Sequence, residues 1–170
     1  MGTNKHGVYK MEKTTKNNVY SADKVADWFL SKKPVSPKKL QKLVYYAYAW
    51  TLTILNDDKD HLNIRLFNDN IEAWVHGPVV PSLYAKYSNY GFNDIDVTIT
   101  EVPKFQDDIE DVLNQVYEVY GDFNGNELES LTHQESPWQN ARQDLSPLDA
   151  SHNRISDTDI FTCYIQRVQN

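Results

Sequence analysis

The sequence contains a single cysteine, six glycines and no long apolar run among its 170 residues. The lone Cys163 rules out an intramolecular disulfide and fits a reducing compartment. The longest stretch of apolar character, residues 43–55, contains three tyrosines and two threonines. It is shorter than the ~20 residues that a membrane span requires, and no apolar run follows the N-terminal lysines as it would in a signal peptide. We therefore expect a cytoplasmic protein without a membrane span.

Recognisable motifs for cofactors and metals are also missing. Six glycines leave little material for a phosphate-binding loop. The sequence has no closely spaced cysteine pair for zinc, no nucleophile elbow around a serine and no Asp-rich calcium loop. Cys163 lies on the apolar face of a predicted helix, which favours a packing role over a nucleophilic one. We therefore expect no cofactor and no bound metal.

Acidic and basic residues are separated along the chain, which carries a net charge of −7. Residues 1–45 contain ten lysines and three acidic residues, a net charge of +7, whereas residues 46–170 carry −14. The lysines of residues 5–42 leave open a DNA-binding autoregulator that contacts phosphates. The acidic remainder would repel a polyanion, so nucleic acid is disfavoured as a partner and a basic protein is favoured.

The chain length predicts one domain with a sizeable core, because a chain of this size buries about 70% of its unfolded surface. Residues 1–18 are polar and predict a disordered tail or, in part, a leader added for expression. Residues 19–170 predict a single domain without internal repeats. Its fold class is expected to be mainly α (α+β), with a small two-stranded sheet.

Two capped helices begin the predicted domain. Ser21 can cap a helix over residues 22–30, and Ser36, followed by a proline, begins a long core helix that ends near residue 55. Lysines in the first turns of this second helix indicate an exposed start. Its aromatic density favours packing, and the alternative is that one or two tyrosines emerge at a partner-binding surface. The lysines are Lys38, Lys39 and Lys42, and the tyrosines are Tyr45, Tyr46 and Tyr48.

The middle of the chain predicts a strand, a turn and a helix. Apolar residues alternate with polar ones over residues 71–75, which predicts a strand that ends at the Gly77-Pro78 turn. A second alternating segment, residues 95–99, is the expected pairing partner of this strand. Between the two segments, Pro81 begins a helix that ends at Gly91, where a glycine can adopt a left-handed C-cap.

The last third of the chain predicts four more helices. Acidic residues begin a helix over residues 107–120. Asn126 is expected to cap the next helix, and Ser136, which precedes a proline, is expected to cap a short third one. Ser156 or Asp157 is expected to cap the last.

The pair His133 and Glu135 is the most suggestive of chemistry. It fits a general base with an orienting acid, or two metal ligands, although the spacing differs from the zinc motif His-Glu-x-x-His. The favoured interpretation is structural, with Thr132 and Glu135 binding backbone amides at a helix junction while Trp138 packs. His76 is a third candidate for the same site, but a histidine beside a turn more often binds the turn. No catalytic residue is predicted, and a metal-dependent enzyme using His133 and Glu135 stays an alternative.

Three separated segments resemble the signature blocks of Panacea-domain proteins, a family that includes SocA-like antitoxins and phage-associated proteins. The segments read PKKLQKLVYYAYAW (37–50), IEAWVHGPVVPSLYAKYSNYG (71–91) and LTHQESPWQNAR (131–142). The matching positions are Leu40, Gln41, Lys42, Leu43, Tyr45, Tyr46, Glu72, Ala73, Trp74, Gly77, Pro78, Val79, Val80, Pro81, Tyr84, Thr132, His133, Glu135, Pro137, Trp138, Ala141 and Arg142. Many members have a tyrosine where this chain has His76, so the resemblance does not imply an essential role for His76.

The resemblance implies the antitoxin of a bacterial or prophage toxin–antitoxin system, which neutralises a cognate toxin by direct protein contact. One SocA-like branch acts instead as an adaptor that delivers its toxin to a ClpXP-type protease, and this remains the alternative. The shared residues are then mostly part of the fold. We expect contacts with a partner at exposed residues that the motifs leave free, such as Lys86, Ser88 and Asn89.

Overall fold

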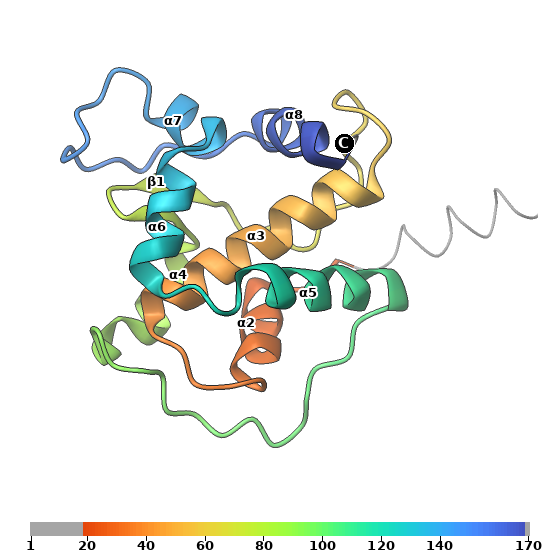
Figure 1. The fold of residues 1–170 in the computed structure, drawn as a ribbon, viewed down its shortest axis with the longest axis vertical. Helices are drawn as coiled ribbons and strands as arrows, with labels where there is room; N and C mark the ends of the chain where they lie inside the picture. The colour runs from red at the N-terminus through yellow and green to blue at the C-terminus, as the bar shows by residue number, and fades with distance from the viewer. Residues whose placement is uncertain (1–18, 169–170) are drawn as a thin grey trace, which may run out of the picture.

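The computed structural model describes residues 19–168, so the predicted tail at 1–18 lies outside the described residues. Within them, seven α-helices and a short 3-10 helix accompany a two-stranded antiparallel sheet. The predicted mainly helical fold with a small sheet is confirmed. Helix α3 (Pro37–Leu55) lies at the centre. Around it pack α2 (Ala22–Leu30), α5 (Asp107–Tyr120), α6 (Gly125–His133) and α8 (Asp157–Val168) (Figure 1).

The helix starts follow the capping residues in the sequence. The Ser21 hydroxyl accepts a hydrogen bond from the backbone N–H of Lys24, and Ser36 does the same for Lys39. These two serines satisfy amides that the first helical turn leaves unpaired. Ser156 accepts from the N–H of Asp159 at the start of α8. The predicted bounds of α2, α3 and α5 agree with the structure.

Two predicted caps are wrong by one or two residues. Asn124, and not Asn126, caps α6, because Asn124 forms a reciprocal capping box with Glu127. At α7 (Ser136–Arg142) the N-cap is Glu135 and Ser136 is already helical. In both cases the N-cap is an earlier residue with an extended backbone, and the predicted residue already lies inside the helix.

Helix α3 is buried on nearly every side. Tyr45, Tyr46 and Tyr48 are all buried, which confirms the packing interpretation of the tyrosines. The predicted exposure of the first turns is wrong, because Lys39 and Lys42 are buried as well. The Nζ of Lys39 donates to the carbonyl of residue 121 at 2.5 Å, and that of Lys42 donates to another carbonyl. A buried ammonium needs such acceptors to offset its lost hydration.

The sheet is a tight hairpin of β1 (Glu72–Trp74) and β2 (Gly77–Val79). Trp74 pairs with Gly77, so only two residues form the turn. The first strand ends before Gly77 as expected, but Gly77-Pro78 begins the second strand and is not the turn. The expectation that residues 95–99 pair with the first strand is wrong. The segment 95–99 is irregular, and the N–H of its first residue donates to the carbonyl of Val35. A two-residue connection closes with less loss of chain entropy than a twenty-residue one.

The second edge of β1 is covered by the loop that precedes α8. The backbone N–H of Ala73 donates to the carbonyl of Asn153 at 2.8 Å, and the N–H of Ile155 donates to Ile71 at 2.8 Å. On the other side of the hairpin, α4 (Pro81–Tyr87) continues into the 3-10 helix η1 (Ser88–Tyr90). The hairpin therefore lies between α4 and the C-terminal loop, as Figure 1 shows.

Candidate partner-binding groove

Helix α3 holds the outer edge of β2 with two side chains. The amide of Gln41 donates to the carbonyl of Val80 at 3.1 Å and accepts from the N–H of Val80 at 2.9 Å. The Nζ of Lys42 donates to the carbonyl of Pro78 at 3.1 Å. Two neighbouring side chains of the first motif segment thus bind the backbone of the second.

Gly77 occupies a position where a side chain would not fit. Its φ is +108°, and a Cβ there would lie 2.6 Å from Cε of Lys42 and 2.9 Å from Oγ1 of Thr132. Residues with a Cβ rarely adopt this backbone conformation. The glycine therefore lets the hairpin lie directly on α3 and α6.

The third motif segment holds the other strand from α7. The indole N–H of Trp138 donates to the carbonyl of Trp74 at 2.8 Å, and the guanidinium of Arg142 donates to the carbonyl of Ala73 at 3.0 Å. The same guanidinium binds two carbonyls of the following loop, at Ser146 and at Asp149. The three segments that resemble a family signature therefore meet at one hairpin.

Glu135 lies in the core as a hydrogen-bond acceptor. It accepts from the hydroxyl of Tyr46 at 2.7 Å and from that of Tyr164 at 2.9 Å, and it forms an ion pair with Arg167. Burial and the neighbouring carboxylate raise the pKa of Tyr46 above its usual range. One carboxylate oxygen thus accepts from the two tyrosine hydroxyls, and the other pairs with Arg167.

The two histidines have different neighbours from Glu135. The ring of His133 stacks on Trp138 with centroids 4.0 Å apart, and burial lowers the pKa of His133. His76 is exposed, and its Nδ1 lies 3.1 Å from the carboxylate of Glu129. Among residues 19–168, no group of three or more His, Cys, Asp or Glu side chains has a geometry that could hold a metal. The structure therefore does not unite His76, His133 and Glu135.

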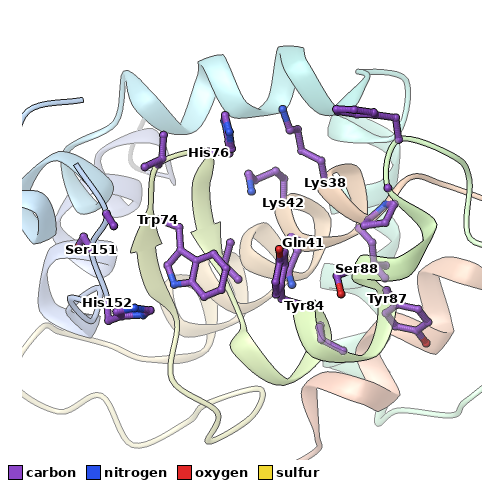
Figure 2. Close-up of a pocket in the computed structure, with 18 residues that line it drawn as sticks. Lys38, Gln41, Lys42, Trp74, His76, Tyr84, Tyr87, Ser88, Ser151 and His152 are labelled. Atoms are coloured by element: carbon purple, nitrogen blue, oxygen red, sulfur yellow. The ribbon is translucent and has the colours of Figure 1, made fainter. Parts of the chain in front are cut away.

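Beside the hairpin the surface is hollowed into a groove of about 480 Å³ (Figure 2). The walls come from the first turns of α3, the hairpin, α4 with η1, and residues 150–152. Its volume falls within the range of typical ligand pockets. The apolar lining residues are Leu40, Trp74, Val75, Val79, Leu83, Tyr84, Tyr87 and Phe92. We call this hollow the hairpin groove.

Most residues that line the hairpin groove fall within a known family pattern, whereas residues 37, 38 and 150–152 lie outside it. The sequence model of the family described as antitoxin SocA-like, Panacea domain, matches residues 40–139. The chain belongs to this Panacea family. Neither a curated protein nor a solved structure matches it significantly. The matched residues of the Panacea chain include Gln41, the whole hairpin and Trp138, whereas Arg142 lies beyond them.

The hairpin groove of this Panacea chain exposes large aromatic surfaces. Phe92 is 97% exposed and Tyr84 is 50% exposed. The rings of Trp74 and Tyr84 lie 4.9 Å apart in an edge-to-face arrangement. Sequence reasoning singled out Tyr84 and Trp74 only as motif residues and missed Phe92. A phenylalanine directly after Gly91, outside any helical period, was the available signal.

The residues predicted to contact a partner lie around one end of the groove. Ser88 lines it, whereas Lys86 and Asn89 are exposed and not part of the lining. Lys86 forms an ion pair with Asp23 of α2, which raises its pKa. Of these three side chains, only Ser88 belongs to the groove.

Basic side chains gather on one side of the hairpin groove. Lys38, Lys42 and His76 lie together there, opposite Trp74 and Tyr84 (Figure 2). Burial lowers the pKa of Lys42 to about 7. Among residues 19–168 of this Panacea chain, no helix is long and apolar enough to cross a membrane.

Proposed function

We propose that this chain is an antitoxin that neutralises a cognate toxin by binding it directly through the hairpin groove. Membership of the antitoxin SocA-like family supports the role, and the exposed aromatic lining of the groove carries the proposal. Nothing in this role requires a catalytic step, a cofactor or a metal. The proposed site of action is the cytoplasm, where the toxin is made.

The groove has the chemistry of a protein-binding site. Aromatic side chains are enriched at such sites because they offer a large contact area at a small cost in conformational entropy. Trp74, Tyr84 and Phe92 provide three of them around one concave surface. A fully exposed phenylalanine without a partner gains most from burial, since burying such a side chain contributes about 1.5–3 kcal/mol.

The frame of the groove is fixed before any partner arrives. Gln41 and Lys42 bind the backbone of β2 from α3, while Trp138 and Arg142 bind β1 from α7. A preformed site loses less conformational entropy when a partner binds. Trp74 and Tyr84 are therefore presented by this hairpin and by α4, whereas Phe92 follows η1.

The proposal predicts a specific pattern in a co-expression experiment. The product of the adjacent gene is expressed alone and together with this chain, and both growth and co-purification are measured. We expect growth arrest by the product alone, and rescue with a co-purified complex when both are present. Persistent arrest, or rescue without a complex, would contradict direct neutralisation.

A pair of surface variants tests the groove itself. Tyr84→Ala with Phe92→Ala removes the exposed rings, whereas Ile54→Ala with Val119→Ala removes exposed apolar side chains from a separate surface between α3 and α5. We expect the first pair to lose the complex and the second to keep it. The reverse result would move the interface to the α3–α5 surface.

The adaptor alternative makes a different prediction for the fate of the toxin. An adaptor lowers the toxin level only while a ClpXP-type protease is active, whereas a blocking antitoxin leaves the toxin level unchanged. Rescue in a strain without the protease, with toxin detected at its normal level, supports the proposal. Rescue that depends on the protease supports the adaptor.

A further inference from the structure

At the basic side of the hairpin groove, two basic side chains contact one carboxylate and a third, Lys42, lies buried beside them. Glu129 is the acceptor for two groups, with Lys38 at 2.6 Å from Oε1 and His76 at 3.1 Å from Oε2. Burial opposes its ionisation, but these hydrogen bonds outweigh burial and lower the pKa of Glu129. One carboxylate thus already serves two basic groups.

Among the described residues, Lys42 has a single, neutral acceptor. Its side chain is buried, with 1% of the residue exposed, and its Nζ donates to the carbonyl of Pro78. An ammonium has three N–H donors, and the other nearby charges are Glu129, already paired, and the like-charged Lys38. A further anion beside this cluster would stabilise the charged form of Lys42.

The lining of the groove contrasts in charge with the rest of the molecule. Four basic side chains line it, Lys38, Lys42, His76 and His152, and no acidic side chain does so among the described residues. The two carboxylates that contact them, Glu129 and the Glu72 partner of His152, lie outside the lining. The chain as a whole carries −7, and residues 46–170 carry −14. A partner that enters this groove therefore meets apolar walls and one basic side, against an acidic background.

We propose that the toxin segment bound in the hairpin groove carries an acidic side chain, which lies beside Lys38 and His76 above the buried Lys42, while its apolar side chains pack on Trp74, Tyr84 and Phe92. This inference rests on the proposed function, and it adds the chemistry of the segment recognised. A charge-assisted hydrogen bond at the edge of an apolar site gives both affinity and register.

The test uses two matched double variants of the full chain. Lys38→Gln with His76→Gln removes the two basic side chains that contact Glu129 at the groove. Lys59→Gln with His61→Gln removes one lysine and one histidine from the exposed loop beyond the other end of α3, where His61 contacts Asp58 as His76 contacts Glu129. The affinity for the product of the adjacent gene is measured by titration calorimetry, after thermal unfolding has shown that both variants fold.

We expect the groove variant to bind about tenfold or more weakly than wild type, as for loss of a hydrogen bond to a charged group, and the loop variant to bind within twofold. In addition, each acidic residue of the toxin is replaced by its amide. One replacement should cause the same loss in the wild-type complex and no further loss with the groove variant, because the two changes remove one interaction.

The inference is overturned if the groove variant binds as tightly as the loop variant, or if no acidic residue of the toxin couples to Lys38 and His76. Either result leaves direct neutralisation intact, provided that the wild-type proteins still bind. Failure of the wild-type chain to bind the toxin at all would instead refute the proposed function.

Discussion

Glu135 accepts a hydrogen bond of 2.7 Å from the hydroxyl of Tyr46, and this bond joins α7 to the middle of α3. The sequence indicates two roles for Glu135, one beside His133 in catalysis or metal binding and one as an acceptor of backbone amides at a helix junction. The amide partners are wrong, because the Glu135 side chain forms no cap hydrogen bond at α7 among the described residues. The structure gives its oxygens to Tyr46, Tyr164 and Arg167. A carboxylate engaged in this way holds three elements together, because Tyr164 and Arg167 lie on α8.

Replacing this carboxylate should destabilise the fold. Glu135→Ala would leave the Tyr46 and Tyr164 hydroxyls without an acceptor, and we expect the free energy of unfolding to fall by about 2–4 kcal/mol. Glu135→Gln keeps an acceptor oxygen and should cost less. Urea denaturation measures both, with Glu101→Ala at an exposed residue as the control. Equal stability of Glu135→Ala and the control would contradict the role given to this residue.

Gly77→Ala should destabilise the hairpin far more than Gly91→Ala. Both glycines have positive φ, +108° and +58°, but a Cβ at Gly77 meets Lys42 and Thr132, whereas a Cβ at Gly91 meets nothing within 4 Å. We expect a loss of about 2–6 kcal/mol at Gly77, from strain and overpacking together, and about 1–3 kcal/mol at Gly91, from backbone strain alone. Thermal unfolding of the two variants is the measurement, and similar midpoints would show that the close approach is relieved elsewhere.

The stability of the fold should rise with pH between about 7 and 9 because of Lys42. Burial lowers the pKa of Lys42 from its ordinary 10.5 to about 7 in the folded state. In this range the unfolded chain binds a proton that the folded chain releases, so unfolding becomes less favourable as pH increases. The cost of burying the charge is fully present below pH 7.

Urea denaturation at pH 7, 8 and 9 can detect this effect. A single group contributes a slope of at most about 1.4 kcal/mol per pH unit. Lys42→Met fills the same volume without a charge and should remove this slope. Burial lowers the pKa of His133, and the contacts of Glu129 with Lys38 and His76 lower the pKa of Glu129 despite its burial, so neither group adds a slope between pH 7 and 9 in the folded chain. A slope unchanged by Lys42→Met would assign the effect to another group.

Gln41→Leu should open the edge of β2 locally. Without the amide, the N–H of Val80 loses its acceptor, and we expect its hydrogen exchange to accelerate by about tenfold or more, as for the loss of one buried hydrogen bond. The amides of α5 provide an internal reference that should not change. Unaltered exchange at Val80 would mean that water or another group replaces Gln41 without cost.

Local signals in the sequence predicted the helices well. Ser21 and Ser36 are side-chain caps next to their helices, and the apolar stripes of α2, α3 and α5 have the helical period throughout. Such features depend on residues within a few positions of each other. They carry over to the structure because tertiary contacts reinforce them.

The hairpin and its groove could not be predicted from local sequence, because they depend on contacts between residues that lie far apart in the chain. Residues 77–79 contain a glycine and a proline, which local rules assign to a turn. They form a strand that α3, almost forty residues earlier, holds in place: Lys42 binds the outward carbonyl of Pro78, and Gln41 binds Val80 directly after the strand. Lysines near the start of a helix are usually exposed to solvent, so no local pattern predicted that Lys42 is buried. The groove beside it follows from the same long-range packing.

The bonds from α3 to the hairpin also decide how another protein can approach it. The outward groups of β2 and the residue after it are the carbonyl of Pro78, which has no N–H, and both backbone groups of Val80. All three already have partners, and the far edge of β1 is occupied by the loop at Asn153. An extended peptide thus finds no free main-chain ladder to join, so this two-stranded sheet is protected against edge-to-edge polymerisation. Whatever enters the groove is recognised through its side chains, which makes recognition dependent on the partner's sequence.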